Sequence, residues 1–445
     1  MLDLDAFGRD VSRGALGRLA TGPAALDELP VLCRRLASGG ERVLLVDDVP
    51  KTASGRDLTQ WIGELVGPVR QVVVRPGHAQ VVLNEATIAS TVAEVGSPAL
   101  IISLGSGTIT DLGKVVSLAC GAPLVAVQTA ASVNGFSDPL SVLVIGGAKR
   151  TRPSAWPAAL VIDDRLIDAA PGVLNRSGVG DAIAIWSAPA DWYLACRLGL
   201  DGPFRDEAVR PVLDAVDSLA DPDPDVARRA LVDSLTVGGL VIGLADSTAP
   251  LSGSEHLTSH ILDMAAMARG VEHDLHGAQV GAATVICTTL WHEARASCTV
   301  FEVPWAGLSY PADLEQRVRD TWASLDTSGA LGEECWTAVA RKATSWLATD
   351  RGECDRNRAD VLEHLFGYVG SPQRSAATLR HWGAAARFSQ LDPPVSREQL
   401  VWTLLALPYM RDRLTLADLL VMTGEWTEHL IQRVLARAEA AGGGA

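Results

Sequence analysis

The sequence lacks several patterns that would assign it to other classes of protein. None of its seven cysteines forms a Cys-x-x-Cys pair, and their odd number and wide scatter argue against a disulfide framework. No apolar run approaches the roughly 18 residues that cross a bilayer. The N-terminus also lacks the charged-then-apolar pattern of a signal peptide. We therefore expect reduced thiols and a soluble, cytoplasmic protein.

Positive charge is scarce as well. The chain has 38 Lys and Arg against 53 Asp and Glu, which gives a formal net charge of -15. A duplex-binding surface needs clustered Lys and Arg, so this balance argues against nucleic acid as a partner. An acidic surface can still contain a local pocket for a small anion, which keeps phosphorylated metabolites open as substrates. We expect a small-molecule substrate, a homo-oligomer, and neither a nucleic-acid nor a membrane partner.

The 445 residues, 48% of them apolar, are enough for two or three domains around large cores. In the first third of the chain, short β-branched runs without internal alternation are separated by helical stretches, which indicates a parallel sheet buried on both faces. After about residue 168 the pattern becomes helical. We predict an α/β domain over 1–168 and an all-helical domain over 169–440, with a cleft between them. The expected strands are 42–46, 72–74, 99–104, 124–127 and 160–162, and the expected helices include 85–95, 181–198, 227–244 and 255–268.

A glycine-rich turn follows the strand expected at 99–104. Gly105, Ser106 and Gly107 lead into a helix that should run to about residue 120. Glycines let a backbone approach a phosphate closely, and the free N–H groups at a helix start favour an anion. A tight strand–helix turn explains the same residues equally well. The pattern is not the Rossmann fingerprint, because Thr110 stands where the third glycine would fall.

Polar residues after two other strands support a dinucleotide site. Asp47 ends the strand at 42–46, where a carboxylate can accept the hydroxyls of an adenosine ribose, although Asp48 can fill the same role. The segment 128–132 places hydroxyl groups after the strand at 124–127. Ligands of open α/β sheets bind at the carboxyl ends of the strands, so we expect a dinucleotide there. A carboxylate at Asp47 favours NAD over NADP.

Two distant stretches carry side chains that bind metals. Asp181 ends a Gly-Val-Gly-Asp segment, His256 and His260 share one helix face, and His276 precedes Gly277 about fifteen residues later. One carboxylate with two imidazoles suits Zn²⁺ and similar ions and leaves coordination positions open. Each residue also has an ordinary explanation, since an Asp after glycine is a good helix N-cap and His pairs often lie in cores or on surfaces. The order of the four residues favours a catalytic metal site.

With these segments the chain resembles the glycerol-1-phosphate dehydrogenase family. The wider superfamily also contains glycerol dehydrogenase, iron-containing alcohol dehydrogenases and dehydroquinate synthase. The resemblance extends over about residues 40–425 and implies a dehydroquinate synthase-like fold. It also implies an NAD(P)-linked alcohol dehydrogenase or carbonyl reductase for a small polyol, a hydroxyaldehyde, or a phosphate or phosphonate ester of one. The matching segments are Gly105-Ser-Gly-Thr-Ile-Thr-Asp111, Thr129-Ala-Ala-Ser132, Lys149-Arg150…Pro153…Pro157…Asp163, Gly178-Val-Gly-Asp181, Ser254-Glu-His-Leu-Thr-Ser-His260, His276-Gly277 and Met410-Arg-Asp-Arg-Leu-Thr415.

The resemblance also implies roles for single residues. It makes Asp181, His256 and His276 the ligands of one divalent metal, which is Zn, Fe or Ni. His260 is then left to face the substrate and to orient it or carry a proton, and Asn134 occupies a substrate-contacting position. The residues that the resemblance places at the dinucleotide are Gly105, Ser106, Gly107, Thr108, Asp111, Thr129, Ala130, Ser132 and Asp138.

Two of these positions depart from the family pattern. Family members usually have Asp where this chain has Asn134, and a Ser that contacts the dinucleotide where it has Asp138. Asn keeps its hydrogen-bonding capacity but cannot act as a base or carry charge. An acid at 138 would repel a nearby pyrophosphate unless it is paired or turned away.

The sequence is also compatible with two alternative functions. A sugar-phosphate cyclase like dehydroquinate synthase also uses NAD and a metal. Such enzymes carry Gly-Gly-Lys after the segment that reads Asn134-Gly-Phe-Ser-Asp138 here, and a Glu ligand in place of Asp181. Both differences count against a cyclase. The other alternative is an inactive binding homologue, and only the changes at 134 and 138 favour it.

Overall fold

The computed structural model describes residues 2–37, 39–75, 81–145 and 148–445. The chain forms two compact units, each of which is described by itself. The first contains Met1–Ile145, Lys149–Gly178 and Ala215–Ser247, and the second contains Gly146–Ala148, Val179–Asp214 and Thr248–Ala445. This division differs from the predicted boundary at 168, because the chain returns to the first unit for residues 215–247.

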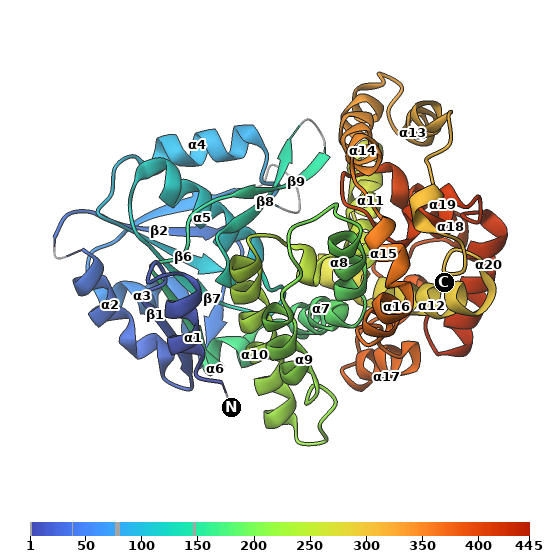
Figure 1. Cartoon of the computed structure of the whole chain (residues 1–445). Coiled ribbons are helices and arrows are strands. Elements are labelled where there is room, and N and C mark those ends of the chain that lie inside the picture. The colour runs from blue at the N-terminus through green and yellow to red at the C-terminus, as the bar shows by residue number, and fades with distance from the viewer. Residues whose placement is uncertain (1, 38, 76–80, 146–147) are drawn as a thin grey trace. The chain divides into compact units, whose positions relative to one another are not determined.

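The first unit is built on a six-stranded parallel sheet (Figure 1). In spatial order its strands are β1 (Arg18–Gly22), β10 (Ala159–Asp163), β7 (Leu124–Gln128), β6 (Leu100–Gly105), β2 (Arg42–Asp47) and β5 (Arg70–Val74). Its helices are α1 (Leu4–Val11), α2 (Leu29–Leu36), α3 (Leu58–Val66), α4 (Glu85–Val95), α5 (Gly107–Cys120), α6 (Asp164–Ala169) and α10 (Pro224–Ala245). The α/β class predicted from the sequence is confirmed.

Apolar residues cover both faces of the sheet, as the unbroken β-branched runs predicted. On β2, Val43 and Leu45 belong to one core with residues of α4 and α5. Leu44 and Val46 point the other way into a second core, with residues of α2 and α3. This arrangement is typical of a parallel sheet with helices on both sides, since consecutive side chains of a strand face opposite directions.

Strand order reverses between β2 and β6. From β2 the chain passes to β5 at one edge and then returns to place β6 on the other side of β2. Ligands of open α/β sheets bind outside the carboxyl ends of strands at such a point. The two strand ends that flank it are Asp47 and Gly105, both of which were predicted to contact a dinucleotide.

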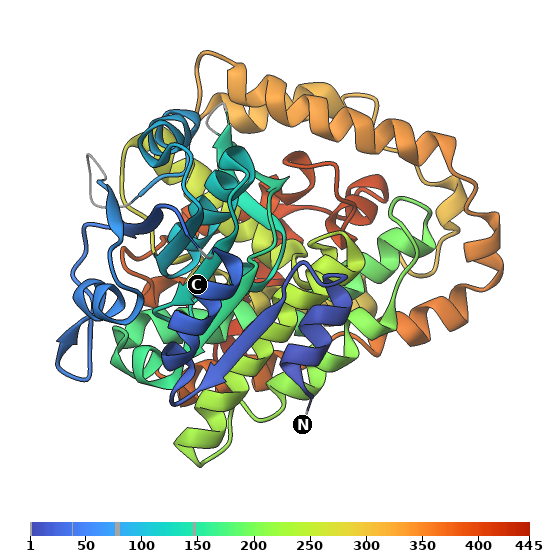
Figure 2. The same cartoon turned by 90° about the vertical axis from the view of Figure 1, so that its left-hand side faces the viewer.

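Five of the described strands were not predicted from the sequence. Two of them, β3 (Thr52–Ala53) and β4 (Arg56–Asp57), form a short antiparallel pair. The other three are β1 and the strands of a second two-stranded sheet, β8 (Leu140–Ile145) and β9 (Ala148–Pro153). β1 is a short edge strand, and α1 packs on it close to the N-terminus (Figure 2). β1 and β8 are only partly buried along their length, whereas every residue of the central strand β6 is buried.

The helix α10 groups with the first unit because two of its neighbours belong there. It packs on α1 and on the short 3₁₀ turn η2 (Gly135–Ser137). The contact with the turn is close, since a Cβ built on Gly239 would lie 2.4 Å from the Asn134 carbonyl oxygen. The helical pattern at 227–244 was read correctly, but periodicity does not reveal which core a helix joins.

The second unit is helical and has one large core in which α11 and α12 pack along each other. Two helices, α7 (Gly172–Ala182) and α9 (Arg210–Val216), have residues in both units. Within its described residues, the chain contains no helix that is both long and apolar enough to cross a membrane. The other helices of this unit are α8 (Ala188–Arg197), α11 (Ser254–Arg269), α12 (His276–Ser297), α13 (Leu314–Ala323), α14 (Ala330–Ala348), α15 (Gly352–Arg356), α16 (Arg358–Phe366), α17 (Pro372–His381), α18 (Arg397–Ala406), α19 (Leu416–Met422) and α20 (Glu428–Ala440).

Candidate functional sites in the two units

The glycine loop of the first unit joins β6 to α5. A Cβ on Gly105 would lie 2.5 Å from the Ile109 Cβ, and one on Gly107 would lie 2.6 Å from the Val133 Cγ2, so both positions require glycine. Ser106 is the N-cap residue, but its side chain makes no capping hydrogen bond to the described residues of α5. The loop therefore presents the first N–H groups of a 14-residue helix, an arrangement that favours a phosphate.

The other predicted dinucleotide residues lie at neighbouring strand ends. The Asp47 carboxylate at the end of β2 accepts hydrogen bonds from the Val49 N–H and the Lys51 ammonium. Immediately after β7, the Thr129 N–H donates to the Gly105 carbonyl over 3.0 Å, which fixes the glycine loop. Thr108 is exposed, whereas Thr129, Ala130 and Ser132 are buried. The contacts of these residues with a dinucleotide stay a prediction.

Asp111 and Asp138 belong to a buried ion cluster that the sequence did not reveal. Its centre is Lys114, whose side chain is fully buried and whose ammonium lies 2.9 Å from an oxygen of each carboxylate. Burial opposes the charged ammonium, but the two carboxylates outweigh this effect and raise the pKa of Lys114. Burial raises the pKa of Asp138 to about 6, even though Lys114 partly offsets it. The contact with the Lys114 ammonium shows that the carboxylate at 138 is paired.

This cluster bears on two predicted cofactor contacts. The Asp111 Oδ2 accepts the Val142 N–H over 3.0 Å, and the Asp138 Oδ1 accepts the Leu140 N–H over 2.8 Å. Both carboxylates thus pair with Lys114 and accept backbone N–H groups, which counts against their direct contact with a dinucleotide. The Asp-x-x-Lys spacing on α5 was the available signal, since residues three apart are neighbours on a helix.

The candidate metal centre lies within the second unit. Asp181, His256 and His276 each place one ligand atom so that all three atoms lie within 4.8 Å of one another. The Asp181 Oδ1 is 3.3 Å from the His256 Nε2 and 3.9 Å from the His276 Nε2. The predicted carboxylate and two imidazoles are thus brought together from α7, α11 and α12.

The position of Asp181 after Gly180 suggested that it begins a helix, and the structure shows that it does not. It is the penultimate residue of α7. The glycine before it serves helix packing instead, because a Cβ on Gly180 would lie 2.0 Å from the Gly277 carbonyl oxygen. The reading of Asp181 as an N-cap is therefore wrong, since a tertiary contact explains the glycine.

Hydrogen bonds orient both imidazoles of the centre. The His256 Nδ1 lies 3.0 Å from the Glu255 carboxylate. The Ser259 hydroxyl donates to the Gln279 Oε1 over 2.7 Å, so it accepts from the His276 Nδ1, which is 2.8 Å away. With the Nδ1 atoms engaged in this way, the Nε2 atoms that face Asp181 are left to bind a cation.

The electrostatics of the centre favour a positive charge. Burial alone would lower the pKa of His256, but the hydrogen bonds and charges of Asp181 and Glu255 outweigh it and raise this pKa to about 9. A site that holds a proton this strongly also attracts a metal ion, which competes with that proton. The donor set and its charge therefore fit a divalent metal.

His260 lies beside the triad of Asp181, His256 and His276, as its spacing from His256 predicted. Its ring centre is 6.4 Å from that of His256 and 5.4 Å from that of His276. The side chain is almost fully buried. Its position one turn beyond His256 on α11 keeps it next to the metal centre, and a role toward the substrate stays a prediction.

A second carboxylate, Asp191 on α8, fixes the first turn of the metal-centre helix and was missed from the sequence. Its Oδ2 accepts both the N–H and the hydroxyl of Ser254, over 2.9 and 2.7 Å. Its Oδ1 accepts the Leu416 N–H over 3.0 Å. Burial raises the pKa of Asp191 to about 7, which these hydrogen bonds only partly counter. A lone Asp in a helical stretch gave no sequence signal for this role.

We expect Ser259→Ala to weaken metal binding about tenfold, because partners of ligand histidines typically contribute 10- to 100-fold to affinity. The variant removes the acceptor that fixes the His276 ring, and chelator competition measures the effect. Ser234→Ala is the matched control, since its buried hydroxyl donates to the Leu231 carbonyl within α10. Equal metal affinity in Ser259→Ala and the wild type would contradict this role.

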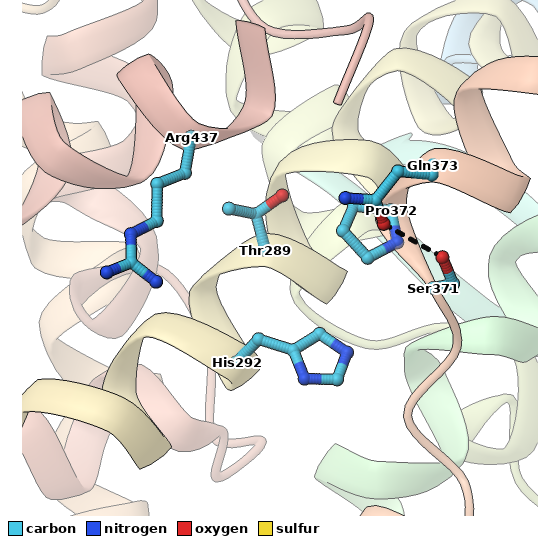
Figure 3. Close-up of a pocket in the computed structure, with 6 residues that line it drawn as sticks. All are labelled: Thr289, His292, Ser371, Pro372, Gln373 and Arg437. Atoms are coloured by element: carbon cyan, nitrogen blue, oxygen red, sulfur yellow. Dashed lines mark hydrogen bonds between the residues drawn. The ribbon is translucent and has the colours of Figure 1, made fainter. Parts of the chain in front are cut away.

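A cavity of about 320 Å³ lies elsewhere in the second unit (Figure 3). Its lining comes from α12, α17, α20 and the residue before α17, and includes Thr289, His292, Ser371, Pro372, Gln373 and Arg437. The Ser371 hydroxyl donates a hydrogen bond to the Gln373 Oε1 over 2.9 Å. No residue of the metal triad lines this cavity, so we do not assign the catalytic site to it.

Comparison with known families and curated proteins gives a consistent result. Residues 20–171 match the model of the iron-containing alcohol dehydrogenase family. The chain is 30% identical over 282 residues to a glycerol-1-phosphate dehydrogenase [NAD(P)+] of Bacillus licheniformis, covering 62% of this chain and 70% of that protein. It is 29% identical over 284 residues to the enzyme of the same name from Methanosarcina acetivorans, covering 62% and 77%.

Solved structures agree on the fold. A probable glycerol dehydrogenase from Sinorhizobium meliloti superposes with a TM-score of 0.57 at 16% identity, covering 95% of this chain and 97% of that one. At this identity the similarity establishes the architecture and not the activity.

Proposed function

Because this chain belongs to the glycerol-1-phosphate dehydrogenase family, within the iron-containing alcohol dehydrogenases, we propose that it is a metal-dependent, NAD(P)-linked oxidoreductase acting on CH–OH groups. The reaction is the reversible oxidation of an alcohol to a carbonyl. The proposed substrate is a small polyol or hydroxyaldehyde, or a phosphate or phosphonate ester of one. The observation that carries the proposal is the triad of Asp181, His256 and His276, whose ligand atoms lie within 4.8 Å of one another.

The protein's own residues have distinct tasks in this proposal. Asp181, His256 and His276 would hold one divalent ion, and Glu255 and Ser259 keep the two imidazoles turned toward it. When bound, the ion supplies Lewis-acid polarisation of a substrate oxygen and the nicotinamide supplies or accepts hydride. His260 orients the substrate or carries the proton. At its position, Asn134 offers an amide N–H and a carbonyl oxygen to the substrate.

The nucleotide is proposed to bind at the carboxyl ends of β2, β6 and β7. The N–H groups at the start of α5 would receive a phosphate, since Gly105 and Gly107 keep the backbone bare there. Asp47 would accept ribose hydroxyls, which favours NAD over NADP.

The decisive test is a spectrophotometric assay of the purified, metal-loaded protein. NADH or NADPH is supplied with dihydroxyacetone phosphate, dihydroxyacetone or short aldehydes, and the loss of reduced-nicotinamide absorbance is followed. We expect turnover with at least one carbonyl, loss of turnover after chelation, and recovery when metal is added back. Failure to bind either nucleotide would refute the dehydrogenase proposal.

A further inference from the structure

The turn that carries Asn134 is held between two helices of the first unit. On one side, the buried Lys114 ammonium on α5 donates to the Gly135 carbonyl over 2.6 Å and to the Leu140 carbonyl. On the other side, the Ser137 hydroxyl donates to the Thr236 carbonyl of α10 over 2.8 Å. The backbone of the turn therefore has fixed points on both α5 and α10.

Asp138 completes the contact with α5. Its Oδ1 lies 2.9 Å from the Lys114 ammonium and also accepts the Leu140 N–H, so one oxygen joins the helix to the end of the turn. Only 4% of this residue is exposed to solvent. Asn134 is half-buried, whereas the acid at 138 is enclosed.

The two departures from the family pattern have a common physical explanation. The family pattern has a carboxylate at position 134, and this chain has one at position 138 instead. The turn therefore keeps one acidic residue, which has moved from 134 to 138. At 138 the acid is paired with Lys114, and position 134 becomes neutral. An amide at 134 can donate a hydrogen bond, which an ionised carboxylate cannot do.

We propose that Lys114 and Asp138 are positioning residues, which hold the turn so that the neutral Asn134 amide faces a hydrogen-bond-accepting group of the substrate. The proposal rests on the dehydrogenase function proposed above. It replaces the predicted contact between Asp138 and the dinucleotide with an internal role for that carboxylate. The accepting group belongs to the substrate class already named, as a carbonyl, phosphate or phosphonate oxygen.

Asp138→Asn is the principal test, because it keeps the shape of the side chain and removes the charge that pairs with Lys114. We expect kcat/KM for the carbonyl substrate to fall about 10- to 100-fold, since a displacement of about 1 Å can cost 100-fold. The dissociation constant of NADH, measured by its fluorescence, should stay within about twofold of the wild type. Asp138→Ser, which has the residue usual in the family, serves as a second variant if the first folds poorly.

Asp163→Asn is the matched control. Asp163 is also a buried carboxylate, which accepts the Leu26 N–H over 2.8 Å and pairs with Arg165 at 2.8 Å. We expect this variant to lose stability without a selective change in kcat/KM. Weaker NADH binding with unchanged kcat/KM in Asp138→Asn would make Asp138 a cofactor contact and overturn the proposal. Parallel changes in both variants would also overturn it, since they would reflect stability alone.

Hydrogen–deuterium exchange separates this proposal from the proposed function. In Asp138→Asn, the backbone amides of residues 134–140 should exchange faster, while those of α4 should be unchanged. Unchanged exchange over 134–140 would refute the positioning role whether or not the wild type turns over a carbonyl. If exchange is faster in the variant but the wild type has no dehydrogenase activity, the effect of Lys114 and Asp138 on the turn would stand. Only the enzymatic function would then be refuted.

Discussion

Replacing His256 with alanine is expected to abolish tight metal binding and to lower kcat/KM by about a thousandfold or more. The side chain is one of three with ligand atoms within 4.8 Å of one another, and its Nε2 lies 3.3 Å from the Asp181 carboxylate. Metal ions contribute several kcal/mol to transition-state stabilisation in such reactions. Each 1.36 kcal/mol is a factor of ten in rate, so a loss of about 4 kcal/mol gives the expected factor.

Metal content after exhaustive dialysis and steady-state kinetics of the same preparations measure both effects. His429→Ala is the control, since His429 is exposed on α20 and lies outside the triad. It should keep the metal content and turnover of the wild type. A His256→Ala protein that retained normal turnover would rule out the metal mechanism. Normal metal content with lost turnover would instead move His256 from metal binding to another catalytic task.

The sequence predicted those parts of the protein that depend on local patterns. The helix expected over 85–95 is α4, and the expected glycine loop joins β6 to α5. Both follow from residues close together in the chain, where apolar period and helix-start chemistry act directly. The candidate metal ligands were also recognisable, because the i, i+4 spacing of His256 and His260 and the His-Gly pair at 276–277 are short motifs in the sequence.

Features that depend on contacts between distant segments could not be predicted. Lys114 looks like an ordinary helix residue until the turn at 134–140 folds against it. The role of Asp191 depends on the contact between α8 and the start of α11, where its carboxylate accepts the Ser254 N–H. Asp181 was placed at the wrong end of a helix because glycine is normally a poor helix residue, and here close packing overrides that propensity.

Gly180→Ala is expected to destabilise the second unit strongly. A Cβ at this position would lie 2.0 Å from the Gly277 carbonyl oxygen and 3.0 Å from the Gly281 Cα. Both atoms belong to the backbone of α12, so no side chain can turn aside to make room. We expect a loss of about 3 kcal/mol or more in the free energy of unfolding, at the upper end of overpacking effects.

The same substitution should weaken metal binding, because the contact lies directly beside two ligands. Asp181 follows Gly180, and His276 precedes Gly277, so separating α7 from α12 separates a carboxylate from an imidazole. We expect metal affinity to fall at least tenfold, because ligand distances in a metal site must hold to within about 0.2 Å. Chemical denaturation with and without metal, together with chelator competition, measures the two effects separately.

Two further variants define what the glycine contact does. Gly63→Ala is the control, since a Cβ there meets no atom of the described structure within 4 Å, and the change should be neutral or stabilise α3 by up to about 1 kcal/mol. Gly281→Ala tests the contact from the other helix, because its Cβ would lie 2.7 Å from the Gly180 Cα. If both helix variants lose metal affinity, the approach of α7 to α12 sets the distance between the ligands. Lost stability at unchanged metal affinity would show that this contact holds the helices together without determining the geometry of the metal centre.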